Sequence, residues 1–292
     1  MKILVAGGTG HTGERVVRAL LSKGYTVRVL SRGGKNDAIL GPLLKLGAEH
    51  SAGDCTRRWT LWRALEGCDA LVSCAHIRHA DACVQACKQA GVSRYIQMSS
   101  ARRFTKFPCE TSRAVIDSEA AIEASDLAYT ILRPTMIFGG RRDANITRLV
   151  AWFRRHRWFP IFGDGKNLVQ PVFVEDLVPA FVHAVEHPEI TSRKAYDLAG
   201  PEPISYEQFI RETAAACGVK NPMLIRIPMS AALIGSRVLP AIITRRGLSA
   251  EQIQRMAEDK IADISVAMRD LQFTPRGYAE AIQLKADGKA EA

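Results

Sequence analysis

Short runs of aliphatic residues alternate with amphipathic segments along the first part of the chain. Residues 3–6 form an unbroken aliphatic run, which is typical of a strand buried on both faces of a parallel sheet. Residues 12–21 then place valine and leucine at helical spacing, with charged residues between them. Gly24 ends this predicted helix, and residues 25–30 predict a second strand. The segment therefore predicts a βαβ unit with a right-handed crossover.

The same alternation continues beyond this unit. Helices are expected at residues 38–46, 61–65, 80–90 and 112–124, and strands at residues 48–52, 70–74, 94–98 and 128–132. Because strands alternate regularly with helices, we predict a doubly wound, Rossmann-type α/β fold with a parallel sheet.

The pattern is less regular in the second half of the chain. Helices are expected at residues 144–157 and 175–186, strands at 172–174 and 195–198, and further helix starts at Ser205, Ser249 and Thr274. We therefore predict a Rossmann domain over residues 1–200, with residues 140–175 contributing to its cleft. A smaller, mostly helical lobe over residues 201–285 would close the cleft, and residues 286–292 would form a frayed tail.

Three glycines separate the first predicted strand from the first helix, in the spacing Gly7-x-x-Gly10-x-x-Gly13. Gly7 permits a tight exit from the strand, Gly10 lets the backbone approach a ligand, and Gly13 lets the helix lie close to the sheet. The N–H groups at the start of the helix, around His11 and Thr12, would favour a pyrophosphate. Glycines at this place between a strand and a helix predict a dinucleotide site.

The end of the second predicted strand indicates which dinucleotide binds. Sites for NAD place a carboxylate there to hold the ribose hydroxyls, but this chain has Ser31 and Arg32. Arg32, helped by Ser31 and Lys35, could instead pair with the 2′-phosphate of NADP, although a solvated surface arginine is the alternative. The sequence therefore favours NADP(H) over NAD(H).

Composition limits the class of protein. The chain has 292 residues, 47% of them hydrophobic, and a formal net charge of +10, which suits anionic partners such as a phosphorylated cofactor or acidic lipid. It carries no nucleic-acid-binding motif, signal peptide or membrane span, and its seven cysteines are an odd number. We therefore expect a cytoplasmic protein. Residues 221–246 are apolar and end in arginines, so they could dock peripherally on a membrane or partner, or pack within their own lobe.

Ligands of α/β sheets gather at the carboxyl ends of the strands. The residues at those ends after the second predicted strand are Asp54 and Cys55, Cys74, Ala75 and His76, Ser99 and Ser100, and Arg133, Pro134 and Thr135. His76 is a candidate proton donor, with a cleft-lining polar residue as the alternative. Cys74, His76, His79, Cys83 and Cys87 lie close in sequence but match no zinc spacing, so core cysteines with surface histidines are favoured over a metal site.

With these motifs in order, the chain resembles the short-chain dehydrogenase/reductase superfamily in its extended and atypical forms. The matching stretches include "AGGTGHTG", "RYIQMSS", "DLAYTILRPTMIFGG", "GDGKNLVQPVFVEDL" and "YDLAGPEPISYEQF". The resemblance implies a cofactor across the three glycines, with Asp54 beside the adenine and Cys74 and Ala75 under the ribose. It also implies that Pro134 lines the nicotinamide.

Two departures from the family pattern bear on activity. Members use a Tyr-x-x-x-Lys pair, whose lysine lowers the pKa of the tyrosine so that the phenol can exchange a proton. Those positions fall here on Thr111 and Val115, and Ser99 remains without that pair. Nucleotide-sugar enzymes tend to carry a basic residue where this chain reads Gln170, which disfavours a sugar epimerase. The chain is most similar to NmrA-like proteins, quinone-type reductases and the nucleotide-binding accessory subunit of respiratory complex I.

Two classes of function follow. The first is a reductase that passes hydride from NADPH to a small hydrophobic acceptor, with Ser99 and His76 as its candidate catalytic residues. The second is a non-catalytic NADP(H) sensor or a structural subunit of a larger assembly. A sugar epimerase is a distant third.

Overall fold

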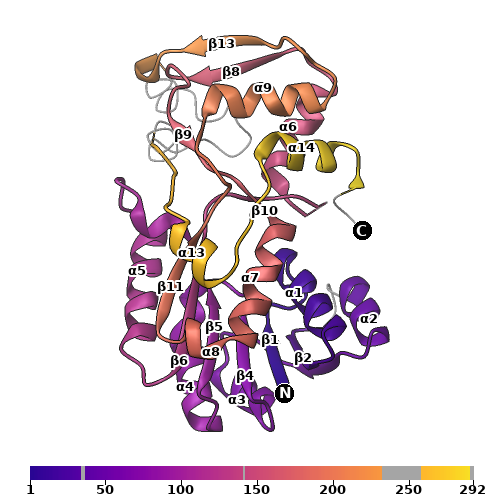
Figure 1. Ribbon diagram of the computed structural model, residues 1–292, viewed down its shortest axis with the longest axis vertical. Helices are drawn as coiled ribbons and strands as arrows, with labels where there is room; N and C mark the ends of the chain where they lie inside the picture. Colours follow the sequence, from indigo (N-terminus) through magenta and orange to yellow (C-terminus); the bar gives the residue numbers. More distant parts are fainter. Residues whose placement is uncertain (34–36, 141, 232–257, 290–292) are drawn as a thin grey trace.

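A computed structural model of the chain describes residues 1–33, 37–140, 142–231 and 258–289. Its centre is a seven-stranded parallel sheet with the strand order β11-β6-β5-β4-β1-β2-β3 (Figure 1). The strands in that order are β11 (Lys194–Leu198), β6 (Ala128–Pro134), β5 (Arg94–Met98), β4 (Ala70–Ser73), β1 (Lys2–Ala6), β2 (Thr26–Ser31) and β3 (Glu49–Ala52). The chain moves outward from β1 to β3 and then returns to β4 on the other side of β1. The sheet is thus doubly wound, as predicted.

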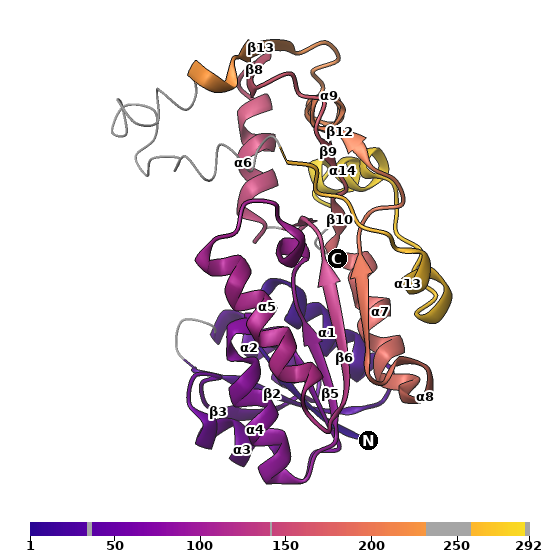
Figure 2. The same ribbon diagram turned by 90° about the vertical axis from the view of Figure 1, so that its left-hand side faces the viewer.

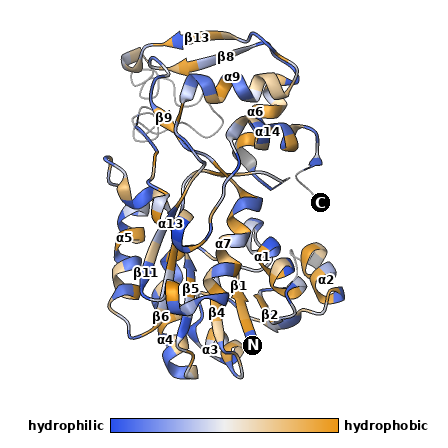
Figure 3. Cartoon of the chain, in the orientation of Figure 1, coloured by the Kyte–Doolittle hydropathy of each residue, from blue (hydrophilic) through white to orange (hydrophobic). Residues whose placement is uncertain are grey.

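The central strands are apolar because both faces of the sheet are covered. Ile3, Val5 and Val72 point to one hydrophobic core, while Leu4 and Leu71 point to another, and all five are fully buried. Alternate residues of one strand therefore enter opposite cores, which explains the uninterrupted aliphatic runs. Figure 3 shows these strands as a hydrophobic band inside helices of mixed polarity.

Helices cover each face of the sheet (Figure 2). One layer consists of α1 (His11–Ser22), α2 (Asp37–Lys45), α7 (Val174–Glu186) and α13 (Ser265–Asp270). The other consists of α3 (Arg58–Leu65), α4 (Ala80–Ala90) and α5 (Glu110–Glu123). Short helical turns complete the connections: η1 (Ile77–His79), η2 (Ala101–Phe104) and α8 (Pro188–Thr191).

A smaller lobe lies beyond the carboxyl edge of the sheet, at the top of Figure 1. Its described helices are α6 (Ala144–Phe153), α9 (Tyr206–Ala216) and α14 (Tyr278–Ala286). Three two-stranded sheets accompany them: β7 (Ile137–Phe138) with β10 (Val172–Phe173), β9 (Leu168–Val169) with β12 (Ile204–Ser205), and β8 (Trp158–Phe162) with β13 (Met223–Ile227). Its core contains Tyr278, whose ring centroid lies 5.0 Å from that of Phe138 and 4.7 Å from that of Phe209.

The core of the lobe and the cores of the sheet each contain residues from before and after residue 200. The lobe draws on residues 137–169 as well as on residues after 203, while residues 264–273 return to pack against the main sheet. The chain therefore crosses between the sheet and the lobe several times, and segments distant in sequence meet at the edge between them.

Several predicted boundaries in the second half are wrong. Helix α6 ends at Phe153 rather than at Arg157, and in the turn that follows, the N–H groups of Arg155 and His156 both donate to the Trp152 carbonyl. Helix α14 begins at Tyr278 rather than at Thr274, since the backbone N–H of Arg276 donates to Asp176 on α7. Ser205 does cap α9, accepting the N–H of Gln208. The predicted start at Ser249 and most of the apolar stretch 221–246 lie outside the described residues. No helix in the described part of the chain is long and apolar enough to cross a membrane.

Candidate functional site

The glycine turn between β1 and α1 depends on the absence of side chains. Gly7 has a φ of +74°, and a Cβ there would lie 2.7 Å from the backbone nitrogen of Ala75. A Cβ on Gly13 would overlap the carbonyl oxygen of Gly7, and one on Gly10 would lie 2.9 Å from the same oxygen. Gly10 is therefore required by the turn itself, besides any ligand that approaches it. The turn leaves the N-terminus of α1 at the carboxyl edge of the sheet, where a phosphate is favoured.

A pocket of about 240 Å³ opens beside this turn, across the ends of β1 to β4. Half of the predicted cofactor residues line it, together with neighbours that were not predicted to bind the cofactor: Gly7, Thr9, Leu30, Ser31, Arg32, Gly53, Asp54, Cys55, Thr56, Ala75, His76 and His79. The pocket lies at the point where the strand order reverses, which is the usual ligand position in doubly wound sheets. Its shape and position suit the adenosine half of a dinucleotide.

The charged residues of this pocket are Arg32 and Asp54. The Arg32 side chain is 74% exposed, and its Nε lies 4.0 Å from the Asp54 carboxylate. Hydrogen bonds from Thr56 lower the pKa of Asp54 despite partial burial, and Arg32 adds to this. Ser31 is buried, and its hydroxyl lies 3.0 Å from His50 Nε2. Arg32 is thus able to swing toward an anion, whereas Ser31 is held in place. Lys35 lies outside the described residues.

His11 and Thr12 do not face that pocket. Burial, Arg15 and Arg142 lower the pKa of His11 to about 4, so the imidazole is neutral at pH 7. Its Nε2 is buried without a hydrogen-bond partner among the described residues. Arg142, which was not predicted, donates to the carbonyl oxygens of Thr9 (2.6 Å) and Gly10 (3.2 Å). The loop after β7 therefore holds the glycine turn from outside.

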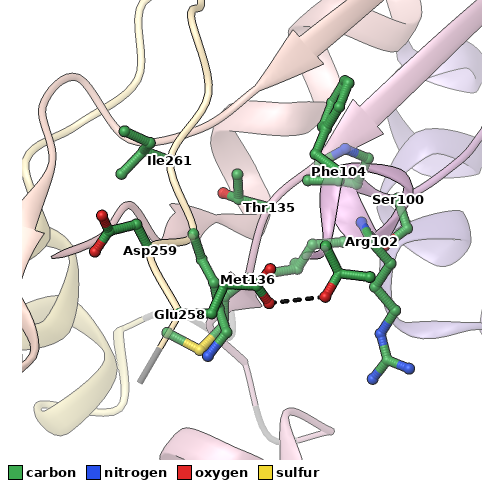
Figure 4. Close-up of a pocket in the computed structure, with 13 residues that line it drawn as sticks. Ser100, Arg102, Phe104, Thr135, Met136, Glu258, Asp259 and Ile261 are labelled. Atoms are coloured by element: carbon green, nitrogen blue, oxygen red, sulfur yellow. Dashed lines mark hydrogen bonds between the residues drawn. The ribbon is translucent and has the colours of Figure 1, made fainter. Parts of the chain in front are cut away.

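A second pocket, of about 400 Å³, lies over the ends of β5 and β6. Figure 4 shows Ser100, Arg102 and Phe104 on one side of it and Asp259 and Ile261 on the other, with Thr135 and Met136 between them. Pro134, the residue expected to line the nicotinamide, also borders it. This pocket and the adenosine-side pocket occupy the same edge of the sheet, the first over β5 and β6 and the second over β1 to β4. Together they can hold the two halves of one dinucleotide.

A third pocket, of about 530 Å³, lies within the lobe and is mainly apolar. Its lining residues are Met136, Ile146, Arg148, Leu149, Trp152, Phe159, Tyr206, Phe209 and Lys260. Met136 and Lys260 also line the second pocket, so the two pockets adjoin. Trp152 is held by a hydrogen bond from its Nε1 to the Trp158 carbonyl (2.6 Å). Sequence reasoning missed this pocket, because its walls come from three separate segments.

Ser99 belongs to a buried ionic network rather than to a pocket. Its hydroxyl donates to the carboxylate of Glu119, which is fully buried on α5. The same carboxylate accepts hydrogen bonds from Arg103 and, at 2.7–3.1 Å, from Nε and Nη2 of Arg133. Ser100, the next residue, does line the second pocket.

The positions of the missing catalytic pair lie on α5, near this network. Val115, at the expected lysine position, is buried in the core against the sheet. Thr111 is half-buried in the first turn of the helix. A neutral threonine and a core valine provide no charge that would lower the pKa of a neighbouring hydroxyl.

The remaining candidates have these positions. His76 lines the adenosine-side pocket, where its Nδ1 accepts from the backbone N–H of Arg78 (3.2 Å), and partial burial lowers its pKa. Cys83 is buried in the core, and burial raises its pKa to about 12. Cys74 is also desolvated, which raises its pKa to about 12. Among the described residues no group of three potential metal ligands comes together.

Comparison with known proteins identifies the domain. Residues 7–149 match the family model described as NAD(P)H-binding. The sterol-4-alpha-carboxylate 3-dehydrogenase (decarboxylating) of Mus musculus is 25% identical over 262 residues, which cover 76% of this chain and 70% of that protein. The mitochondrial NADH dehydrogenase [ubiquinone] 1 alpha subcomplex subunit 9 of Arabidopsis thaliana is 28% identical over 202 residues, which cover 64% of this chain and 49% of that protein.

Solved structures show the same fold. The crystal structure of gox2253 superimposes with a TM-score of 0.78 at 20% sequence identity, covering 98% of this chain and 96% of that one. At 20% identity the similarity shows a shared fold and no more. Because the superposition covers 98% of this chain, the shared fold includes the lobe as well as the sheet.

Proposed function

We propose that this chain, whose residues 7–149 match the NAD(P)H-binding family model, is a reductase that passes hydride from NADPH to an apolar acceptor. The observation that carries the proposal is the row of pockets. The adenosine-side pocket and the pocket beside Pro134 lie at the same edge of the sheet, and the latter adjoins the apolar pocket of the lobe. A molecule in the lobe could therefore reach the reactive end of a cofactor held on the sheet.

Hydride transfer requires above all that the nicotinamide and the acceptor are held in the correct relative orientation. Bound NADPH would supply a hydride to an electrophilic carbon of the acceptor, and a carbonyl or quinone oxygen would take a proton from water, because His76 lines the adenosine-side pocket instead. The acceptor gains two electrons, which balances the oxidation of the cofactor. Met136 and Thr135 would fix the meeting point of the two molecules, since well-oriented reactants need no further covalent assistance. The mouse relative is named as a dehydrogenase of a sterol carboxylate, which supports an acceptor with a large hydrocarbon part.

The first prediction concerns the cofactor. We expect NADPH to bind more tightly than NADH, because Arg32 is exposed at the end of β2 and can pair with a 2′-phosphate. Arg32→Ala should weaken NADPH binding about tenfold and leave NADH binding unchanged. Isothermal titration of both cofactors checks this. Arg18→Ala, which removes an exposed arginine paired on its own helix, is the matched control. Equal affinities for the two cofactors in the unsubstituted protein would contradict the prediction.

The second prediction concerns turnover. NADPH oxidation should be detectable with at least one acceptor from a panel of quinones, aldehydes and enones. Met136→Trp should lower kcat/KM about tenfold, since it fills the wall that two pockets share. Met268→Trp, at a half-exposed position on α13, should have no effect. NADPH binding without turnover on any acceptor would overturn the reductase.

A specific observation favours a second candidate, a non-catalytic NADP(H)-binding subunit. Val115 is part of the core and the Ser99 hydroxyl is engaged by Glu119, so neither position offers a proton relay. The Arabidopsis relative is named as a subunit of an NADH dehydrogenase, which supports an assembly role. In that case a native pull-down should recover stable partners, and Met136→Trp should not alter them.

A further inference from the structure

The two-stranded parallel ribbon of β8 and β13 has one face that the lobe does not cover. Directly paired residues of adjacent strands project to the same face, and here every pair on the outward face is apolar. These pairs are Trp158 with Met223, Pro160 with Ile225, and Phe162 with Ile227. On the inward face Ile161 is fully buried, while Phe159 and Leu224 pack against the core of the lobe.

The outward face is exposed at the tip of the molecule. Met223 is 64% exposed, Ile225 43% and Trp158 38%. Figures 1 and 2 both show the ribbon at the end of the long axis that lies farthest from the main sheet. Large apolar side chains that are exposed together, rather than scattered singly, are typical of an interaction surface.

Positive charges lie at the end of the ribbon where both strands begin. Arg155, Arg157 and Lys220 come just before the strands and are exposed. The backbone N–H of Met223 donates to the Arg157 carbonyl (2.8 Å), which holds the two strand starts together. None of the three cations has an ion-pair partner in the part of the chain that the structure describes. Residues 154–163 and 219–231 contain no aspartate or glutamate.

The carboxylates that come next along the chain leave this positive end uncompensated. Glu207 on α9 is already paired with Arg211 (2.9 Å) and with Arg226 of β13 (2.7 Å). Asp164 keeps its negative charge, but it lies in the turn that follows β8, at the opposite end of the ribbon. The outward face therefore combines an apolar surface with a cationic end.

We propose that this face of the ribbon docks on the surface of an anionic lipid bilayer. Met223 and Ile225 would enter the boundary between head groups and acyl chains, as the apolar face of an interfacial segment does. Trp158 lies beside them, and tryptophan is enriched at that depth of a membrane. The cations at the start of the strands would meet the negatively charged head groups, where each lysine or arginine adds to the attraction.

The size of the face favours a bilayer over a protein partner or a second copy of the chain. Each strand has five residues, so the ribbon is about 16 Å long and about 10 Å wide. That area is well below the roughly 800 Å² that each partner buries in a stable protein interface. A bilayer sets no such minimum, because apolar insertion and attraction to acidic lipid add to each other.

Docking would also place the apolar pocket of the lobe against the membrane. Phe159, on the inward face of the ribbon, lines that pocket. Trp152 lines it too, and its Nε1 donates to the Trp158 carbonyl (2.6 Å). The ribbon is thus a wall between the pocket and the proposed docking surface.

The test is flotation of the full chain with two kinds of vesicle, without cofactor. One kind contains phosphatidylcholine alone, and the other also contains about one third phosphatidylserine. We expect the chain to bind the anionic vesicles at least about tenfold more tightly, and added salt to weaken this binding. The double variant Met223→Ser/Ile225→Ser should reduce the affinity for anionic vesicles about tenfold. Arg155→Gln/Arg157→Gln should also reduce it about tenfold.

Two control variants match these substitutions away from the ribbon. Ile116→Ser/Met268→Ser removes two apolar side chains that are 44% and 51% exposed on α5 and α13. Arg63→Gln/Arg113→Gln removes two exposed arginines on α3 and α5. Both controls should bind anionic vesicles like the unsubstituted chain. Far-UV circular dichroism checks that all four variants are folded.

The outcomes separate the ribbon from the overall charge of the chain. Equal binding to the two kinds of vesicle, no binding to either, or an equal loss in the controls would overturn the proposal. A dimer that Met223→Ser/Ile225→Ser converts to a monomer, with vesicle binding unchanged, would assign the face to a second copy and overturn it as well. Vesicle binding is measured without cofactor, so its result is independent of whether the chain oxidises NADPH.

Discussion

The carboxylate of Glu119, on α5, is the centre of a buried network of hydrogen bonds and ion pairs. It is fully buried, and its hydrogen bonds join the end of β5, the η2 turn and β6 through Ser99, Arg103 and Arg133. A buried charge of this kind is tolerated because several donors surround it. The network places the end of β6, and with it Pro134, relative to α5.

Glu119→Gln tests this role. The amide cannot balance two guanidinium groups, so we expect the free energy of unfolding to fall by about 3 kcal/mol. Denaturation with urea measures the change. Glu123→Gln on the same helix removes a carboxylate that is 44% exposed and 3.6 Å from Arg133, and it should leave the midpoint unchanged. Equal effects of the two substitutions would contradict a special role of the buried network.

At the scale of elements, α13 attaches the returning chain to the edge of the sheet. Asp270 at its end accepts hydrogen bonds from Lys194 Nζ (2.9 Å) and the Tyr196 hydroxyl (3.2 Å) on β11, and from Arg269 Nε (2.8 Å). The bond from Arg269, followed by that from Lys194, lowers the pKa of Asp270 to about 2. This attachment matters for the site because residues 258–261, shortly before α13, line the second pocket, and Lys260 also lines the pocket of the lobe.

Asp270→Asn should lower the free energy of unfolding at pH 7 by about 1 to 2 kcal/mol, with Arg269 contributing little because it is exposed. The folded pKa lies below the unfolded value of 3.8, so this stability is present above pH 4 and is lost as the pH falls toward 2. The difference between the protein and the variant should shrink over that interval. Asp126→Asn, at an exposed position, is the control. A difference that stays constant from pH 4 to 2 would exclude the carboxylate as its source.

At the scale of the whole molecule, α14 connects the lobe to the glycine turn. Lys285 is almost completely buried and donates to the Gly140 carbonyl (2.6 Å) and the Thr147 hydroxyl (3.0 Å). The same loop carries Arg142, whose guanidinium bonds the glycine turn from outside. The position of the lobe is thus linked, through this loop, to the glycine turn that would hold the pyrophosphate.

Lys285→Met should therefore weaken NADPH binding although the lysine lies outside the adenosine-side pocket. We expect the dissociation constant to rise about fivefold, an effect typical of coupling between adjacent structural units. Lys289→Met, which removes an exposed lysine just beyond α14, is the control. If both variants bind NADPH like the unsubstituted chain, the lobe and the cofactor site are independent.

The first half of the fold was predictable because its signals are local. An aliphatic run must be buried on both faces, and a glycine turn before a helix must take a φ that other residues avoid, so β1, the turn and α1 follow from about twenty residues. The fold class and the NAD(P)H-binding domain were confirmed for the same reason. Half of the predicted cofactor residues share one pocket, because parallel strands present their carboxyl ends at one edge.

The sequence by itself thus determined the sheet, the turn and the class of cofactor, since each depends on neighbours in the chain. Only the tertiary structure decided where Lys260 meets Met136, how residues 137–169 join those after 203 in one lobe, and that Val115 is a core residue. These contacts join segments separated by tens to more than a hundred residues. No local period or motif encodes them, because they arise when apolar faces from distant segments are buried together.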